Sequence, residues 1–210
     1  MGGSSSRFTS RVVVGLIAGL VGLVSPASAQ WKLGFDLGQG RYFGSSRDRS
    51  GSPDSVSLSP HLPTTIGIRA ERSVGRQFLG LSLMYEQPGL GADMRGYAII
   101  FTRDLRALEL TPYGSFRFGS AGSTGDLRLQ AGVAADAWGV TGYDPRVRLG
   151  PMLGLAWEWK VSSHVAGVLR GEGVVTKSLF DDGDLPSQLV LIPTWRLGMT
   201  IGLRYVSRPQ

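Results

Sequence analysis

The sequence predicts an all-β protein built as one eight-stranded antiparallel up-and-down barrel, with a ten-stranded barrel as the alternative. Three observations lead to this fold. Eight segments alternate large apolar residues with small or polar ones, clusters of Gly, Ser, Pro and Asp separate them, and period-two spacing dominates over helical spacing. The 210-residue chain has no linker-like stretch and no Cys, so we expect a single domain held by its fold alone.

The first 29 residues are of a different kind. Arg7 and Arg11 precede an apolar run over 12–24, and Ala27-Ser28-Ala29 follows it. The run is shorter than the roughly 20 residues of a membrane-spanning helix. It predicts a cleavable secretory signal peptide over 1–29 and a barrel domain over 30–210, with an uncleaved anchor as the alternative.

The first four expected strands are WKLGFDLG (31–38), IGIRAE (66–71), LGLSLMYE (79–86) and LELTPYGSFRF (108–118). The other four are LRLQAGVAAD (127–136), VRLGPMLGLAWEW (147–159), HVAGVLRGEGVV (164–175) and the closing run over 189–205. Most reach the roughly 9 to 11 residues that a membrane-crossing strand needs. The seventh alternates least cleanly, although Arg170 and Glu172 share one side.

The direction of the apolar face decides which kind of barrel this is. In a soluble barrel, the face exposed to water would be rich in Lys, Glu, Asn and Gln. The face opposite the apolar one instead has Gly, Ser, Thr and Ala spaced by single charges. That face suits the narrow lumen of an eight-stranded barrel, so the apolar face is expected to meet lipid. Aromatic residues on it would form two interface girdles: Trp31, Tyr85, Phe116, Phe118, Trp157, Trp159, Trp195 and Tyr205.

Charged residues on the inward face are expected to form an ion-pair network, because unpaired buried charges are costly. Seven arginines and seven acids allow nearly complete pairing. They are Arg69, Arg117, Arg128, Arg148, Arg170, Arg196 and Arg204 with Asp36, Glu71, Glu86, Glu109, Asp136, Glu158 and Glu172.

A ninth apolar segment, RGYAIIFT over 95–102, conflicts with the even strand number of single-chain bacterial barrels. We assign Tyr97–Phe101 to an extension or hairpin above the membrane. Short turns are then expected at 73–76, 119–125 and 161–164, and longer outward loops at 39–54, 87–107, 139–145 and 177–188.

Taken together, the signal peptide ending in ASA, the eight strands, LTPYGSFRFG and LGMTIGLRY resemble the small outer-membrane β-barrels of the OmpX and OmpA membrane-domain kind. The resemblance implies a place in the outer membrane of a Gram-negative-type bacterium, among lipid and lipopolysaccharide. It also implies a barrel-assembly machinery that reads a terminal aromatic. Here that aromatic is Tyr205, and five residues follow it.

Candidate chemistry is sparse. His61 and His164 are the two histidines, and the short turn holding Ser162, Ser163 and His164 is not expected to give catalytic geometry. The acidic stretch around Asp181, Asp182 and Asp184 lacks the ligand spacing of a calcium loop, and GQGRYFG (38–44) lacks the pattern of a phosphate loop. We expect no catalytic residue, cofactor or metal.

The expected function is therefore structural support of the envelope or surface binding through the outward loops. A narrow porin-like channel is the alternative, followed by a lipid A-modifying enzyme. Nucleic acid is not an expected partner, since the charge outside the signal peptide is only about +4, from the 22 basic and 16 acidic residues of the chain less two arginines. Arg41, Arg47 and Arg49 are candidates to contact lipopolysaccharide head groups.

Overall fold

The computed structural model describes residues 30–49, 56–74, 77–94, 97–101, 105–121, 125–140, 145–181 and 183–207. The predicted signal peptide lies outside these ranges. Every regular element within them is a strand. No described helix is long and apolar enough to cross a membrane.

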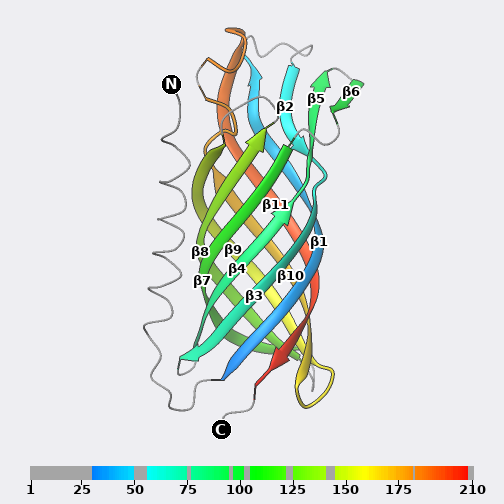
Figure 1. Ribbon diagram of the computed structural model, residues 1–210, viewed down its shortest axis with the longest axis vertical. Coiled ribbons are helices and arrows are strands. Elements are labelled where there is room, and N and C mark those ends of the chain that lie inside the picture. The colour runs from blue at the N-terminus through cyan, green and yellow to red at the C-terminus, as the bar shows by residue number, and fades with distance from the viewer. Residues whose placement is uncertain are drawn as a thin grey trace, which may run out of the picture. The chain divides into compact units, whose positions relative to one another are not determined.

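Eight strands form a closed antiparallel barrel in which each pairs with the next barrel strand along the chain (Figure 1). They are β1 (Trp31–Asp48), β3 (Thr64–Val74), β4 (Gln77–Glu86), β7 (Leu105–Ala121), β8 (Gly125–Val140), β9 (Arg146–Lys160), β10 (Val165–Thr176) and β11 (Leu189–Val206). Pairing of β1 with β11, from Lys32 opposite Val206 to Asp48 opposite Leu189, closes the barrel. The eight-stranded prediction is confirmed.

Three short strands stand outside the barrel wall at the end drawn uppermost in Figure 1, here called the upper end. They are β2 (Val56–His61), β5 (Gly89–Met94) and β6 (Tyr97–Phe101). β2 pairs with β1 at Ser46 and Arg47, β5 pairs with β2, and β6 pairs with β5. We call β2, β5, β6 and the top of β1 the upper sheet. The assignment of Tyr97–Phe101 to a hairpin outside the barrel is confirmed.

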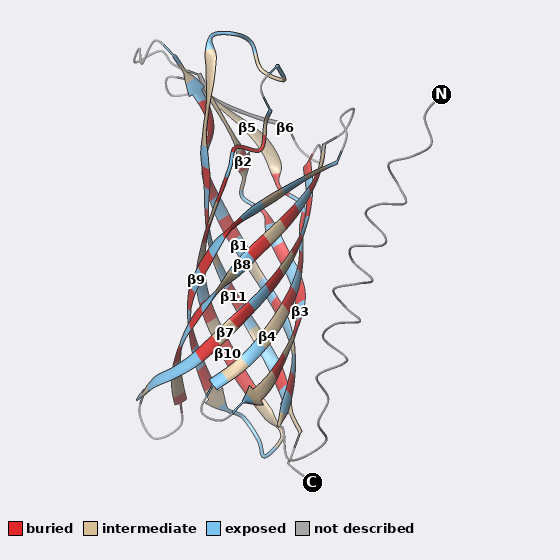
Figure 2. Ribbon diagram, turned by 90° about the vertical axis from the view of Figure 1, so that its left-hand side faces the viewer, coloured by how far each residue is buried: buried red, intermediate tan, exposed pale blue. Residues whose placement is uncertain are grey.

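Buried and exposed residues alternate along the barrel strands (Figure 2). Strand β9 reads buried at every even position from Gly150 to Glu158 and exposed at the odd positions between them. Glycine makes room for the larger inward side chains. A Cβ added to Gly80 would lie 2.4 Å from the Tyr113 ring, so a small residue on β4 accommodates a large one on β7.

Strand β1 is longer than the sequence indicates. It continues to Asp48, so much of the expected loop over 39–54 is strand. The physical reason is that β11 supplies partners as far as Leu189, and a bulge absorbs the change of register between Gly44 and Ser45. Both bulge residues have positive φ, 85° and 91°. The turn at 161–164 lies where it was predicted, while 75–76 and 122–124 lie outside the described residues.

Candidate functional site

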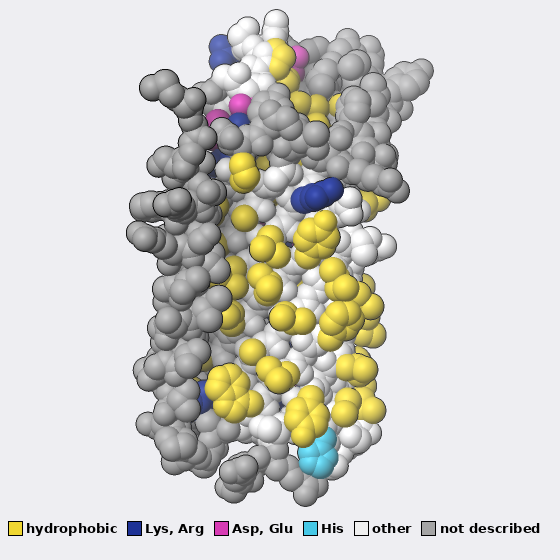
Figure 3. Space-filling model, viewed as in Figure 1, with side chains coloured by type: hydrophobic (Ala, Val, Ile, Leu, Met, Phe, Trp, Pro, Cys, Tyr) yellow, Lys and Arg dark blue, Asp and Glu magenta, His cyan; other side chains and the backbone are white. Residues whose placement is uncertain are grey.

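The outer face of the barrel is a band of exposed apolar side chains (Figure 3). Leu149 is 64% exposed and Met199 63%, whereas Arg170 and Arg204 inside are each 1% exposed. This distribution is the reverse of that in a soluble domain, in which charged residues are almost never fully buried and contiguous apolar patches are small. The band has the chemistry of a lipid-facing surface.

Aromatic residues lie near both edges of this band. Seven of the eight predicted girdle residues are exposed. Trp159 is half-buried, with its ring 4.8 Å from that of Trp157. A Cβ added to Gly167 would lie 2.3 Å from the Trp159 ring, so this indole covers a glycine on the neighbouring strand.

The lumen contains six buried cations and seven buried carboxylates among the described residues. The cations are Lys32, Arg69, Arg128, Arg170, Arg196 and Arg204. The carboxylates are Asp36, Glu71, Glu86, Glu109, Asp136, Glu158 and Glu172. These groups form three clusters stacked along the barrel.

The lower cluster is centred on Glu71 and Glu158. Arg204 Nη1 lies 2.6 Å from Glu71 Oε2 and 3.3 Å from Glu158 Oε2. Arg128 approaches the same two carboxylates at 3.6 Å and 3.4 Å. Lys32 donates to Glu158 from the lower side. Two acids are thus shared by three cations.

The middle cluster joins four strands through Asp36. Arg69 Nε donates to this carboxylate at 2.6 Å and Arg170 Nη1 at 2.8 Å. The second arm of Arg69 reaches Glu172 at 2.9 Å, and Arg170 Nε donates to Gln130 at 2.8 Å. Both guanidiniums therefore cross the lumen and bridge strands that are not neighbours.

The upper cluster places one arginine among several acids. Arg196 pairs with Glu86 at 2.8 Å, with Glu172 at 3.4 Å and with Glu109. Asp136 lies opposite Glu109 in the β7–β8 register. Arg196 is therefore the charged group on which the upper acids converge.

The three clusters place side chains of opposite charge along the length of the lumen. Tyr113 connects the lower two, because its hydroxyl donates to Glu71 at 2.7 Å and Arg69 lies 5.7 Å from its ring centroid. Glu172 connects the upper two. Buried ion pairs of this kind are costly to break in a low-dielectric interior.

Twelve of the fourteen charged residues that we predicted on the inward face lie in this lumen. They are Asp36, Arg69, Glu71, Glu86, Glu109, Arg128, Asp136, Glu158, Arg170, Glu172, Arg196 and Arg204. The prediction for Arg117 is wrong: its side chain is 58% exposed and pairs with Asp126. Arg117 lies opposite the inward Arg128 but stands at the lower end of β7, where it lines the cavity at the opening of the lumen and not the buried network. Lys32 was missed, although its place on the polar side of the first strand marks it as inward.

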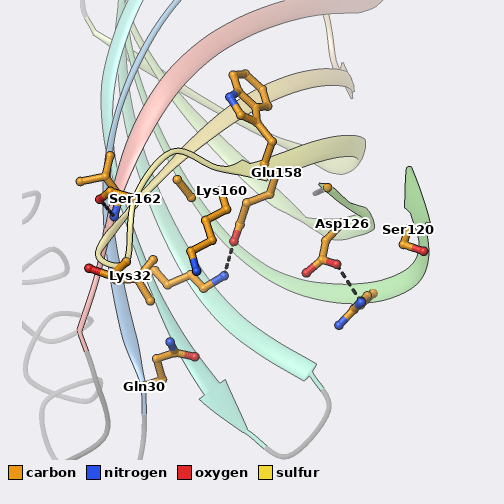
Figure 4. Close-up of a pocket in the computed structure, with 14 residues that line it drawn as sticks. Gln30, Lys32, Ser120, Asp126, Glu158, Lys160 and Ser162 are labelled. Carbon is orange, nitrogen blue, oxygen red and sulfur yellow. Dashed lines mark hydrogen bonds and ion pairs between the residues drawn. The ribbon is translucent and has the colours of Figure 1, made fainter. Parts of the chain in front are cut away.

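A cavity of about 570 Å³ opens below the lower cluster (Figure 4). Lys32 and Glu158 lie on its inner side, and Lys160, Ser162 and Asp126 line it nearer the opening. The charged lining suits water. The Lys32–Glu158 pair marks the level at which the packed lumen begins.

At the upper end, the segment 177–188 folds over the barrel, and we call it the mouth loop. Its Leu179 is 2% exposed and belongs to an apolar cluster with Tyr42, Leu105 and Trp138. The Tyr42 hydroxyl donates to Glu86 at 2.6 Å, so this apolar cap rests directly on the upper cluster.

Arginines of β9 hold the mouth loop. Arg148 donates to the carbonyls of Ser178 and Leu179, at 2.7 Å and 3.3 Å, and to Asp181 at 2.6 Å. Arg146 pairs with Asp184. Arg148 was predicted within the lumen network; it lies instead at the mouth, with its guanidinium turned to the loop.

The hold on the mouth loop is expected to weaken in acid. The hydrogen bond from Arg146, followed by that from the Asp181 N–H, lowers the pKa of Asp184 from its ordinary value. The contribution of this carboxylate is therefore complete above pH about 4 and is lost as pH falls through the lowered pKa.

A spin label on Ser187→Cys should keep its mobility from pH 7 to 5 and become more mobile below about pH 4. In an Asp184→Asn background it should be mobile already at pH 7. A label in the Asp184→Asn background that is as immobile at pH 7 as in the wild type would refute this role.

The structure also shows the contacts of the residues considered as catalytic or metal-binding candidates. Ser163 Oγ lies within hydrogen-bond distance of His164 Nδ1, at 2.8 Å, in the turn for which no catalytic geometry was expected. The imidazole stacks on Tyr205, and among the described residues no carboxylate hydrogen-bonds it. Asp181 and Asp184 are engaged by arginines, and Asp182 lies outside the described residues. Within the described ranges, no group of three His, Cys, Asp or Glu side chains is placed to hold a metal.

The fold is similar to those of solved outer-membrane proteins. The outer membrane protein OprG from Pseudomonas aeruginosa superposes with a TM-score of 0.59 at 13% identity, covering 87% of this chain and 97% of that one. Neisserial surface protein A (NspA) gives a TM-score of 0.50 at 9% identity, covering 84% and 96%. No protein-family model and no curated protein sequence matches the chain. The likeness confirms the fold predicted by resemblance, that of a small outer-membrane β-barrel protein.

Proposed function

We propose that this protein is a non-conducting outer-membrane barrel that anchors a surface-exposed binding face. The observation that carries the proposal is the lumen, which three ion-pair clusters and an apolar cap fill from Lys32 to Leu179. A barrel of this kind holds a sheet and loops at the outer surface and adds a rigid element to the envelope.

The binding face consists of the upper sheet and the mouth loop. β2, β5 and β6 extend β1 beyond the barrel wall (Figure 1). The edges of such a sheet, and loops held on a rigid scaffold, are common sites of recognition. An extracellular partner would therefore be met here, and the barrel below would act as its anchor.

The chain's closing strand fits assembly into an outer membrane. Tyr205 is exposed on the outer face, and its backbone pairs with Leu33 and Val165. Ser207 then exchanges hydrogen bonds with the Trp31 backbone, donating to the carbonyl at 3.1 Å and accepting from the N–H at 3.0 Å. The barrel is thus closed down to its lower rim. We propose that residues 1–29 direct export and that the assembly machinery reads the strand ending at Tyr205.

Conductance separates an anchoring barrel from a narrow channel. The purified barrel, added to planar lipid bilayers in 1 M KCl, should give no discrete conductance steps, because each layer of the lumen is occupied by paired side chains. Retarded mobility of boiled against unboiled samples in SDS gels checks that the inserted protein is folded. Regular steps from heat-modifiable protein would overturn the proposal in favour of a channel.

A further inference from the structure

Arg41 stands on the outer face of β1 at a depth set by strand geometry. It follows Trp31, at the lower edge of the apolar band, by ten residues. At about 3.3 Å per residue and a strand tilt of about 40°, that places it roughly 25 Å higher, at the upper edge of a band about 25 Å tall. Phe43 and Trp195, opposite each other in register, lie at the same edge.

The Arg41 side chain is exposed, and its guanidinium carbon lies 5.1 Å from the centroid of the Phe43 ring. A cation is unfavourable in hydrocarbon, so at this depth the guanidinium must turn towards the head groups. Its planar fork binds phosphate with two parallel hydrogen bonds.

A hollow adjoins Arg41, between β1 and the strands β2 and β5. It arises because β2 pairs with β1 only at Ser46 and Arg47 and then pairs with β5. The cavity is about 480 Å³, within the size range of small-ligand sites. Its lining brings together hydrogen-bonding groups and an aromatic ring, contributed by Arg41, Phe43, Ser57, Ser59 and His61.

We propose that this hollow binds the phosphorylated head group of an outer-leaflet lipid, with Arg41 as the phosphate ligand. The inference rests on the proposed membrane location. The depth of the site favours a lipid source, because the acyl chains of a lipid held there would lie along the apolar band directly below. Ser57, Ser59 and His61 supply polar contacts for the rest of the head group.

The same geometry separates the three arginines that the sequence grouped together. Arg47 follows Arg41 on β1 by six residues, and Arg49 stands just beyond the end of the strand, eight residues after Arg41. At the same rise and tilt, Arg47 lies about 15 Å above the edge of the band. Arg41 is therefore the one of the three at phosphate level.

Arg106 provides a matched control. It is also exposed on the outer face, ten residues from Phe116 of the lower girdle, so it stands at the same depth as Arg41. It belongs to β7, which is three strands away from β1 around the barrel and does not line the hollow. Replacing Arg106 removes a positive charge at the same depth as replacing Arg41 does, but leaves the proposed site intact.

The test is a titration of the refolded full chain in neutral-detergent micelles with bisphosphorylated lipid A, and with the same lipid after enzymatic dephosphorylation. The wild-type protein should bind the phosphorylated form at least 10-fold more tightly, and Arg41→Gln should remove that preference. Arg106→Gln should stay within 2-fold of wild type. Inorganic phosphate at the same concentration should not compete.

Equal binding of both lipids, an equal loss in the two variants, or full competition by inorganic phosphate would overturn the lipid site. Heat-modifiability of each variant shows that its barrel is folded. The conductance experiment is independent of Arg41, so failure of the head-group site and failure of the anchoring function give different results.

Discussion

Replacing Arg196 with Met is expected to destabilise the barrel by about 3–5 kcal/mol, the usual cost of removing one partner from a buried ion-pair cluster. Arg196 pairs with Glu86, Glu109 and Glu172, and the side chains of all three acids are buried in the lumen. Methionine fills much of the same volume, so the loss measures unpaired charge more than a cavity. The measurement is reversible urea unfolding in lipid vesicles, followed by Trp fluorescence.

The matched control is Arg117→Met. Sequence reasoning placed Arg117 and Arg196 in the same network, but the structure pairs Arg117 with Asp126 in an exposed position. Exposed ion pairs contribute about 0–1 kcal/mol. Adding Glu109→Gln to Arg196→Met should restore part of the loss, since it removes one unpaired charge. Equal destabilisation by the two arginine variants would contradict the buried network.

The contrast between these two arginines shows what alternation predicts. Period two assigns each residue of a strand to the inside or the outside, and it placed Arg69, Arg170 and Arg204 correctly in the lumen. It does not say how deeply an inward residue is buried. Arg117 lies opposite the inward Arg128, yet its side chain is 58% exposed because it stands at the lower end of β7, where the lumen opens into the lower cavity.

The sequence also did not predict which acid each arginine of the lumen pairs with. Arg69 meets Asp36 on the adjacent strand and Glu172 across the barrel, so its pairing depends on which strands face one another. That arrangement follows from closure of β11 onto β1, which is a property of the whole chain. Composition supported near-complete pairing without showing which acid each arginine would meet.

The mouth loop illustrates a different limit. The sequence placed 177–188 among the outward loops, yet Leu179 is buried and Arg148 donates to the loop carbonyls. An apolar pair, Leu179-Phe180, just before the acidic stretch was the available signal. Its docking site, made of Tyr42, Leu105 and Trp138, comes from three strands far apart in sequence.

Replacing Met199 with Arg is expected to cost about 2–4 kcal/mol in lipid vesicles, because it places a charge at mid-depth of the bilayer. Met199 is 63% exposed and lies on β11 about halfway between Trp195 and Tyr205. Leu203→Arg is the control, at 60% exposure and two residues from Tyr205. Its charge can reach the lower interface, so its cost should be smaller by at least about 1 kcal/mol.

This pair distinguishes a lipid-facing surface from a water-facing one. The two side chains are almost equally exposed and point from the same face of the same strand, so a water-facing surface predicts two similar and small effects, within about 0.5 kcal/mol. A lipid-facing surface predicts a gradient with depth, because only a bilayer makes the cost of a charge depend on its distance from the interface. Equal urea midpoints for the two variants in vesicles would refute the orientation of the apolar face. A lower urea midpoint for Met199→Arg than for Leu203→Arg would support it.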